Sequence, residues 1–115
     1  MTEGWVFDLD GVVWRGAQPI PRVPAAIAEL IATGADVLFV TNMSAHPVRS
    51  VEDKLASLGI DGRGRVVTSA MAAARLVEPG ERVLACAGPG VVEELEARGA
   101  IVVEAGPADA VVVGH

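Results

Sequence analysis

Residues 6–11, Val-Phe-Asp-Leu-Asp-Gly, decide how this chain is interpreted, because an apolar run leads directly into two aspartates one residue apart. The run that begins at Trp5 predicts a buried strand. Side chains two residues apart in a strand share a face, so Asp8 and Asp10 are expected to project together where the strand ends. Ligands of open α/β sheets bind at that carboxyl edge. Two adjacent carboxylates repel each other unless a cation lies between them or one carries a proton, which predicts a Mg²⁺ site that handles an anionic substrate.

Length and composition limit the class of protein. The chain has 115 residues, enough for one modest domain, and 51% of them are apolar, which permits a true core. The formal net charge of −6, with Lys54 as the single lysine, argues against nucleic-acid binding. Cys86 is the only cysteine and lies in an apolar run, so we expect a buried thiol, no internal disulfide and no cysteine-based zinc site. No stretch reaches the roughly 20 apolar residues of a membrane span, and a cytoplasmic protein is expected.

Strand-like and helix-like segments alternate along the chain. Apolar spacing predicts helices at 23–31, 47–58, 70–77 and 91–98, and strands at 5–9, 37–40, 66–67, 83–87, 100–103 and 110–113. Ser69 is the expected N-cap of the third helix. Glycines follow three helices and precede apolar residues, as left-handed caps do: Gly34, Gly59 and Gly99. The alternation predicts a Rossmann-like α/β fold with a parallel sheet built by right-handed crossovers.

A second informative segment follows the predicted strand at 37–40. Thr41 is expected at the same sheet edge as Asp8, and Asn42 comes directly after it. A hydroxyl and a free N–H at such an edge can hydrogen-bond a phosphoryl oxygen. A Thr-Asn pair alone is usually turn chemistry, but an aspartate pair one βαβ unit earlier favours the phosphate interpretation.

With both segments in place, the chain resembles the haloacid dehalogenase superfamily of phosphohydrolases. The first motif of that superfamily, Asp-x-Asp-Gly after an apolar strand, matches residues 8–11, and its second motif matches Thr41. Residues 10–16, Asp-Gly-Val-Val-Trp-Arg-Gly, are similar to the branch that contains 4-nitrophenylphosphatases and phosphoglycolate phosphatases. Thr-Asn-Met-Ser at 41–44 and Thr-Ser-Ala at 68–70 resemble the same branch.

The resemblance implies roles for individual residues. Asp8 would attack phosphorus and form an aspartyl-phosphate, while Asp10 would protonate the leaving alkoxide and then deprotonate water. Mg²⁺ would bind the carboxylate of Asp8 and the backbone carbonyl of Asp10. Thr41, Asn42 and Gly11 would contact the substrate phosphate. The implied substrate is a small phosphorylated metabolite, for example phosphoglycolate, glycerol phosphate or a nucleoside monophosphate.

The chain also departs from the pattern of this superfamily. Met43 replaces the usual second asparagine of the second motif. The third-motif cation and the fourth-motif acidic pair lack counterparts, because Lys54 falls in the second predicted helix, on its expected solvent face, and Asp109 precedes the last strand. Residues 1–115 are therefore interpreted as the N-terminal half of such a core, without its cap and C-terminal half. We expect little or no phosphatase turnover from this chain alone.

Two other classes of function stay open at this point. The chain could be a non-catalytic module that binds Mg²⁺ or phosphate or serves as an interaction surface, and an exposed sheet edge would favour homo-oligomers. It could also bind a nucleotide through Gly88 and Gly90, although Glu93 occupies the position of the third glycine of a dinucleotide fingerprint. Trp14 could line the mouth of the substrate site or pack the aspartate loop.

Overall fold

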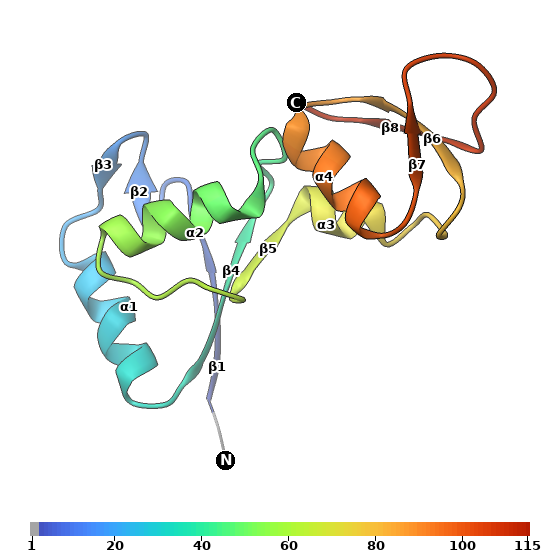
Figure 1. Ribbon diagram of the computed structural model, residues 1–115. Helices are drawn as coiled ribbons and strands as arrows, with labels where there is room; N and C mark the ends of the chain where they lie inside the picture. The colour runs from blue at the N-terminus through green and yellow to red at the C-terminus, as the bar shows by residue number, and fades with distance from the viewer. Residues whose placement is uncertain (1–2) are drawn as a thin grey trace. The chain divides into compact units, whose positions relative to one another are not determined.

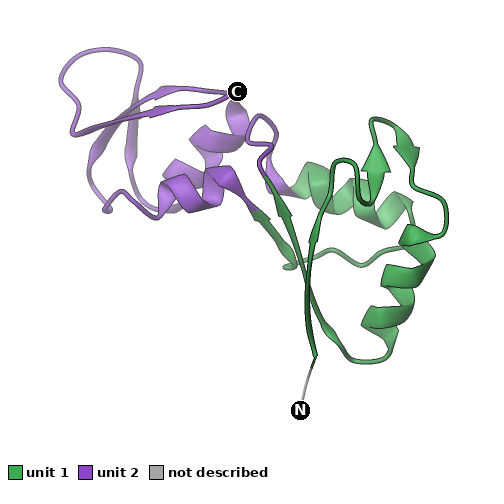
Figure 2. Ribbon diagram, turned by 180° about the vertical axis from the view of Figure 1, so that it is seen from behind, with its two compact units in different colours: residues 1–41, 49–67 green, residues 42–48, 68–115 purple. Residues whose placement is uncertain are grey.

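The structure, a computed structural model, describes residues 3–115. Two compact units make up the chain (Figure 2): one comprises residues up to 41 together with 49–67, and the other comprises 42–48 and 68–115. Each unit has its own three-stranded sheet. Within the described residues, no helix is long and apolar enough to cross a membrane.

The first unit is built on a three-stranded sheet in the order β1-β4-β5 (Figure 1). Strands β1 and β4 run parallel, with Asp8 opposite Val40 at their carboxyl ends. This unit contains β1 (Gly4–Asp8), α1 (Val23–Ala32), β4 (Asp36–Thr41), α2 (Val48–Ser57) and β5 (Val66–Thr68). Two end residues, Val48 of α2 and Thr68 of β5, are assigned to the other unit. Each element lies where the apolar spacing predicted it.

One face of this first sheet carries the core. Strand β4 alternates strictly, with Val37 and Phe39 buried toward α1 and α2 and with Leu38 and Val40 exposed. The helices and the loop after α2 add further buried side chains, namely Ile27, Val51, Leu55 and Ile60. The other face leaves apolar side chains in solvent: Val6, Leu38, Val40 and Val67. A half-covered sheet of this kind explains the period-2 pattern of β4.

A short hairpin follows β1 that sequence periodicity did not predict. Strands β2 (Trp14–Arg15) and β3 (Gln18–Pro19) pair antiparallel around Gly16, whose φ is +60°. Two-residue strands are too short to produce a hydrophobic period. The hairpin matters for the site because its first residue, Trp14, is 2% exposed.

The second unit contains a separate three-stranded sheet in the order β7-β6-β8. Both outer strands run parallel to the central strand. Its elements are α3 (Ser69–Ala74), β6 (Arg82–Cys86), α4 (Pro89–Ala97), β7 (Ile101–Val103) and β8 (Ala110–Val113). A core of small and branched side chains joins the helices to this sheet: Ala70, Ala74, Val77, Val83, Val91, Leu95 and Ala100.

Two local expectations need correction. Thr68 rather than Ser69 caps α3, since its side chain accepts a hydrogen bond from the Met71 N–H at 3.1 Å. Cys86 is exposed rather than buried, because it lies at the very end of β6.

Candidate active site

The two aspartates lie where the sequence predicted them, at the carboxyl end of β1. Asp8 is the last residue of the strand and Asp10 follows after one residue, and both are exposed. Leu9 between them is 1% exposed and anchors the segment in the core of the first unit. The Leu9 N–H donates to Oδ1 of Asp8 at 2.9 Å, which orients that carboxylate relative to its own backbone. Alternation thus directs one apolar side chain inward and two carboxylates outward.

A tight turn after β1 holds Asp10 in place. The Leu9 carbonyl accepts hydrogen bonds from the N–H groups of Val12, Val13 and Trp14 at 3.1, 2.8 and 3.3 Å. Gly11 adopts φ +84°, a conformation that suits glycine, and its N–H donates to the Trp14 carbonyl at 2.7 Å. The Gly11 N–H is therefore used within the turn, and the contact of Gly11 with a substrate phosphate stays a prediction.

The structure reveals contacts to Asp10 that sequence reasoning missed. The Trp14 indole Nε1–H donates to Oδ1 of Asp10 at 3.1 Å. Lys54 lies over the Trp14 ring, with Nζ 4.1 Å from the ring centroid, and it also donates to the Gly16 carbonyl at 2.8 Å. Lys54 is thus half-buried against the hairpin and not on the solvent face expected for it. Trp14 packs the aspartate loop, which was one of its two predicted roles.

Thr41 ends β4 at the same sheet edge as Asp8, one position beyond Val40, the register partner of Asp8. Thr41 is 7% exposed and lies on the covered face with Phe39, whereas Asp8 is exposed. Asn42, the next residue, belongs to the second unit, is exposed, and accepts a hydrogen bond from the Ser69 hydroxyl through its carbonyl at 2.9 Å. It stays a prediction that the oxygens of Asp8 and Thr41 converge on one ion or phosphate.

The donor atoms at this edge suit a hard divalent cation. Carboxylate and carbonyl oxygens are the ligands that Mg²⁺ prefers, and this ion usually binds through one or two carboxylates, with waters and substrate phosphates completing its coordination. The predicted ligands are the carboxylate of Asp8 and the backbone carbonyl of Asp10. Among residues 3–115, no group of three or more Asp, Glu, His or Cys side chains is arranged to hold a metal ion. A divalent cation at Asp8 and Asp10 therefore stays a prediction.

The Gly88–Gly90 loop does not present a phosphate cradle. The Gly88 N–H donates to the His115 carbonyl at 2.6 Å, and the Gly90 N–H donates to the Ala45 carbonyl at 3.0 Å. A Cβ on Gly90 would overlap the carbonyl oxygens of Ser44 and His46. These glycines permit a close approach between two loops of the second unit. A dinucleotide fingerprint instead needs such amides to face the ligand, so the structure argues against the nucleotide interpretation.

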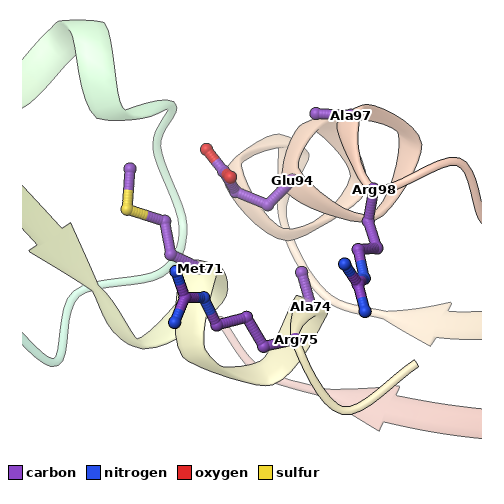
Figure 3. A pocket seen from close by; sticks show the side chains of 6 residues that line it. All are labelled: Met71, Ala74, Arg75, Glu94, Ala97 and Arg98. Atoms are coloured by element: carbon purple, nitrogen blue, oxygen red, sulfur yellow. The ribbon is translucent and has the colours of Figure 1, made fainter. Parts of the chain in front are cut away.

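The second unit also has a hollow of about 320 Å³ between α3 and α4 (Figure 3). Glu94 and Arg98 come from α4 and its C-cap, and Met71 and Arg75 come from α3 and its C-cap. The Arg98 guanidinium donates to the Val77 carbonyl at 3.0 Å, so it contributes to holding the helices together. Burial, with a smaller contribution from the Glu93 carboxylate, raises the pKa of Glu94 above its usual value.

The raised pKa of Glu94 predicts a pH-dependent stability. Because the folded chain holds the Glu94 proton more tightly than the unfolded chain, stability is full below the ordinary glutamate pKa and falls as the pH rises through the folded value. Glu94→Gln should therefore stabilise the chain at about pH 7, by less than about 1 kcal/mol, and should give no gain near pH 3. Urea unfolding at both pH values measures this difference. Glu96→Gln on the exposed face of α4 is the control, and an equal gain from Glu94→Gln at both pH values would contradict the assignment.

Comparisons with known proteins identify the class to which this α/β chain and its aspartate motif belong. The family model for haloacid dehalogenase-like hydrolases matches residues 5–101. The chain therefore belongs to this family.

Individual relatives are phosphatases. The chain is 37% identical over 109 residues to glycerol-3-phosphate phosphatase of Gallus gallus. The aligned region covers 90% of the chain and 35% of that protein. A p-nitrophenyl phosphatase from Archaeoglobus fulgidus superposes with a TM-score of 0.89 and 29% identity, over 99% of the chain and 45% of that structure. A glycerol phosphate phosphatase from Mycobacterium tuberculosis in complex with magnesium superposes with a TM-score of 0.85 and 34% identity, over 99% of the chain and 36% of that structure. The chain thus spans between about a third and under half of the length of these relatives.

Proposed function

We propose that this chain carries the nucleophile half of a Mg²⁺-dependent phosphomonoesterase that acts on a small phosphate ester. The observation that supports this most is the Asp-x-Asp-Gly motif, which the fold places at the carboxyl end of β1 with both carboxylates exposed. The phosphatase relatives and the magnesium complex of one of them agree with the proposal. Glycerol phosphate and p-nitrophenyl phosphate are the substrates to try first.

The proposed reaction has two steps. A carboxylate oxygen of Asp8 attacks phosphorus, the bond from phosphorus to the ester oxygen breaks, and that oxygen takes a proton from Asp10. Water then attacks the phosphorus of the aspartyl-phosphate and gives a proton to Asp10, which releases inorganic phosphate and restores Asp8. Thr41 and the Asn42 N–H would orient the phosphoryl group. Mg²⁺, bound by the Asp8 carboxylate and the Asp10 carbonyl, would neutralise charge on the phosphoryl oxygens.

The main alternative is a non-catalytic module that binds Mg²⁺ or phosphate. It is favoured by the lack, among residues 3–115, of a group of three or more Asp, Glu, His or Cys side chains that could hold a metal ion. Titration of the 115-residue chain with BeF₃⁻ separates the two proposals, since this phosphoryl mimic binds a nucleophilic carboxylate. The phosphatase proposal expects stoichiometric, Mg²⁺-dependent capture on Asp8, observed by fluorine NMR. Binding of Mg²⁺ without capture of the mimic would favour the module.

A further inference from the structure

The chain's only lysine and one of its two tryptophans form a stacked pair beside Asp10. The indole Nε1–H of Trp14, at the start of β2, donates to Oδ1 of Asp10 at 3.1 Å. Lys54, from α2, places Nζ 4.1 Å from the centroid of the Trp14 ring. The same ammonium donates to the Gly16 carbonyl in the hairpin turn at 2.8 Å. These contacts connect α2, the hairpin and the loop after β1, and the last of them is made to the Asp10 carboxyl group.

The hydrogen bond from Trp14 distinguishes the two carboxyl oxygens of Asp10. An indole N–H is a donor and has no acceptor capacity, so the Asp10 oxygen that faces it accepts the hydrogen bond. Oδ1 is that oxygen. Oδ2 is thus the carboxyl oxygen that the indole does not engage. The bond also restricts rotation of the carboxyl group about its terminal torsion.

Lys54 restrains the donor itself. A cation over the face of an indole is attracted by the ring quadrupole, and this attraction strengthens when the ring is shielded from water. Trp14 is 2% exposed, so it meets that condition. The bond from Lys54 to Gly16 also fixes the hairpin from which Trp14 projects. The charge above the ring should in addition polarise the indole N–H and make it a better donor.

We propose that Trp14 and Lys54 are positioning residues that fix the orientation of the Asp10 carboxyl group, with Oδ1 held by the indole N–H and Oδ2 presented to the substrate. The proposal rests on the proposed function, in which Asp10 is the general acid and base. A tryptophan that merely packs the loop would also find a hydrogen-bond acceptor for its buried N–H. The test therefore needs a measurement that responds to proton transfer and not to packing.

Two esters with different leaving groups supply that measurement. p-Nitrophenolate departs without a proton, whereas the alkoxide of glycerol 3-phosphate needs one. In the native gene product, Trp14→Phe keeps the ring and removes the N–H, and it should lower kcat about tenfold for glycerol 3-phosphate but less than about threefold for p-nitrophenyl phosphate. Lys54→Met should shift the ratio of the two kcat values in the same direction by a smaller factor. Trp5→Phe replaces the other tryptophan, which is 41% exposed, and should leave the ratio unchanged.

An equal loss on both esters in Trp14→Phe would overturn the positioning role and leave the proposed function standing. A wild-type product that turns over neither ester would refute the proposed function, and with it the positioning role. The contact has its own readout in the 115-residue chain, the indole ¹H–¹⁵N signal that Trp14→Phe removes. Asp10→Ala should move that signal and accelerate its exchange with solvent. An unchanged signal would overturn the hydrogen bond on which the proposal depends.

Discussion

Asp8→Asn should abolish capture of BeF₃⁻ by the 115-residue chain and should lower phosphatase turnover of the native gene product by about 10³-fold or more. Beryllium completes its coordination through a carboxylate oxygen, and a neutral amide is a poor substitute. The same substitution removes the attacking atom of the proposed reaction. Fold stability should change little, because Asp8 is exposed and its side chain accepts a hydrogen bond from the N–H of its own neighbour Leu9. Fluorine NMR and a phosphate-release assay measure the two effects.

Two further substitutions sharpen this result. Asp36→Asn removes the same charge from the opposite end of the same parallel strand pair, where Asp36 lies across from Gly4, and should leave capture and turnover unchanged. Asp10→Asn should keep BeF₃⁻ capture while turnover of an alkyl ester falls, because capture needs the nucleophile and not the general acid. Capture that persists in Asp8→Asn would show that another group binds the mimic, and the proposed nucleophile would then be wrong.

Much of this architecture is predictable from local sequence patterns. Hydrophobic spacing locates all four helices, and it locates every strand except those of the hairpin, because period and burial are properties of a single segment. Gly34, Gly59 and Gly99 have φ values of +90°, +82° and +93°, as expected for left-handed helix caps. The aspartate doublet is visible for the same reason, since two residues of one strand end share a face wherever the strand is placed.

Features that depend on distant partners were not predictable. The period of a strand indicates which face is buried, but not which strand lies beside it, so the strand orders β1-β4-β5 and β7-β6-β8 could not be predicted from it. Lys54 contacts the carbonyl of Gly16, 38 positions earlier, and nothing in the helical pattern around Lys54 signals that contact. The bond between Trp14 and Asp10 spans four residues, yet it depends on an irregular turn that no periodicity describes. The parts of the candidate site that sequence reasoning missed are therefore its supporting contacts.

The second large expected effect concerns the loop that precedes α4. Gly90→Val should destabilise the second unit by about 3 kcal/mol, because its Cβ would overlap the backbone carbonyl oxygens of Ser44 and His46. Backbone atoms cannot rotate away as a flexible side chain can. The hydrogen bond from the Gly90 N–H to the Ala45 carbonyl, at 3.0 Å, would be strained by the same displacement. Urea unfolding measures the loss, and hydrogen exchange of the α4 amides locates it in the second unit.

The matched control for this substitution is Gly4→Val. Gly4 lies in β1, where a Cβ would meet nothing within 4 Å, so the stability change of this variant should stay within about 0.5 kcal/mol.

The same pair of variants also tests the nucleotide interpretation of the glycine loop. If Gly88 and Gly90 served a nucleotide, the wild-type chain would bind NAD or ATP and Gly90→Val would lose that binding. We expect no saturable nucleotide binding in the wild type, because both glycine N–H groups already donate to carbonyls of the chain itself. A stability loss in Gly90→Val without a nucleotide effect would assign these glycines to close loop packing.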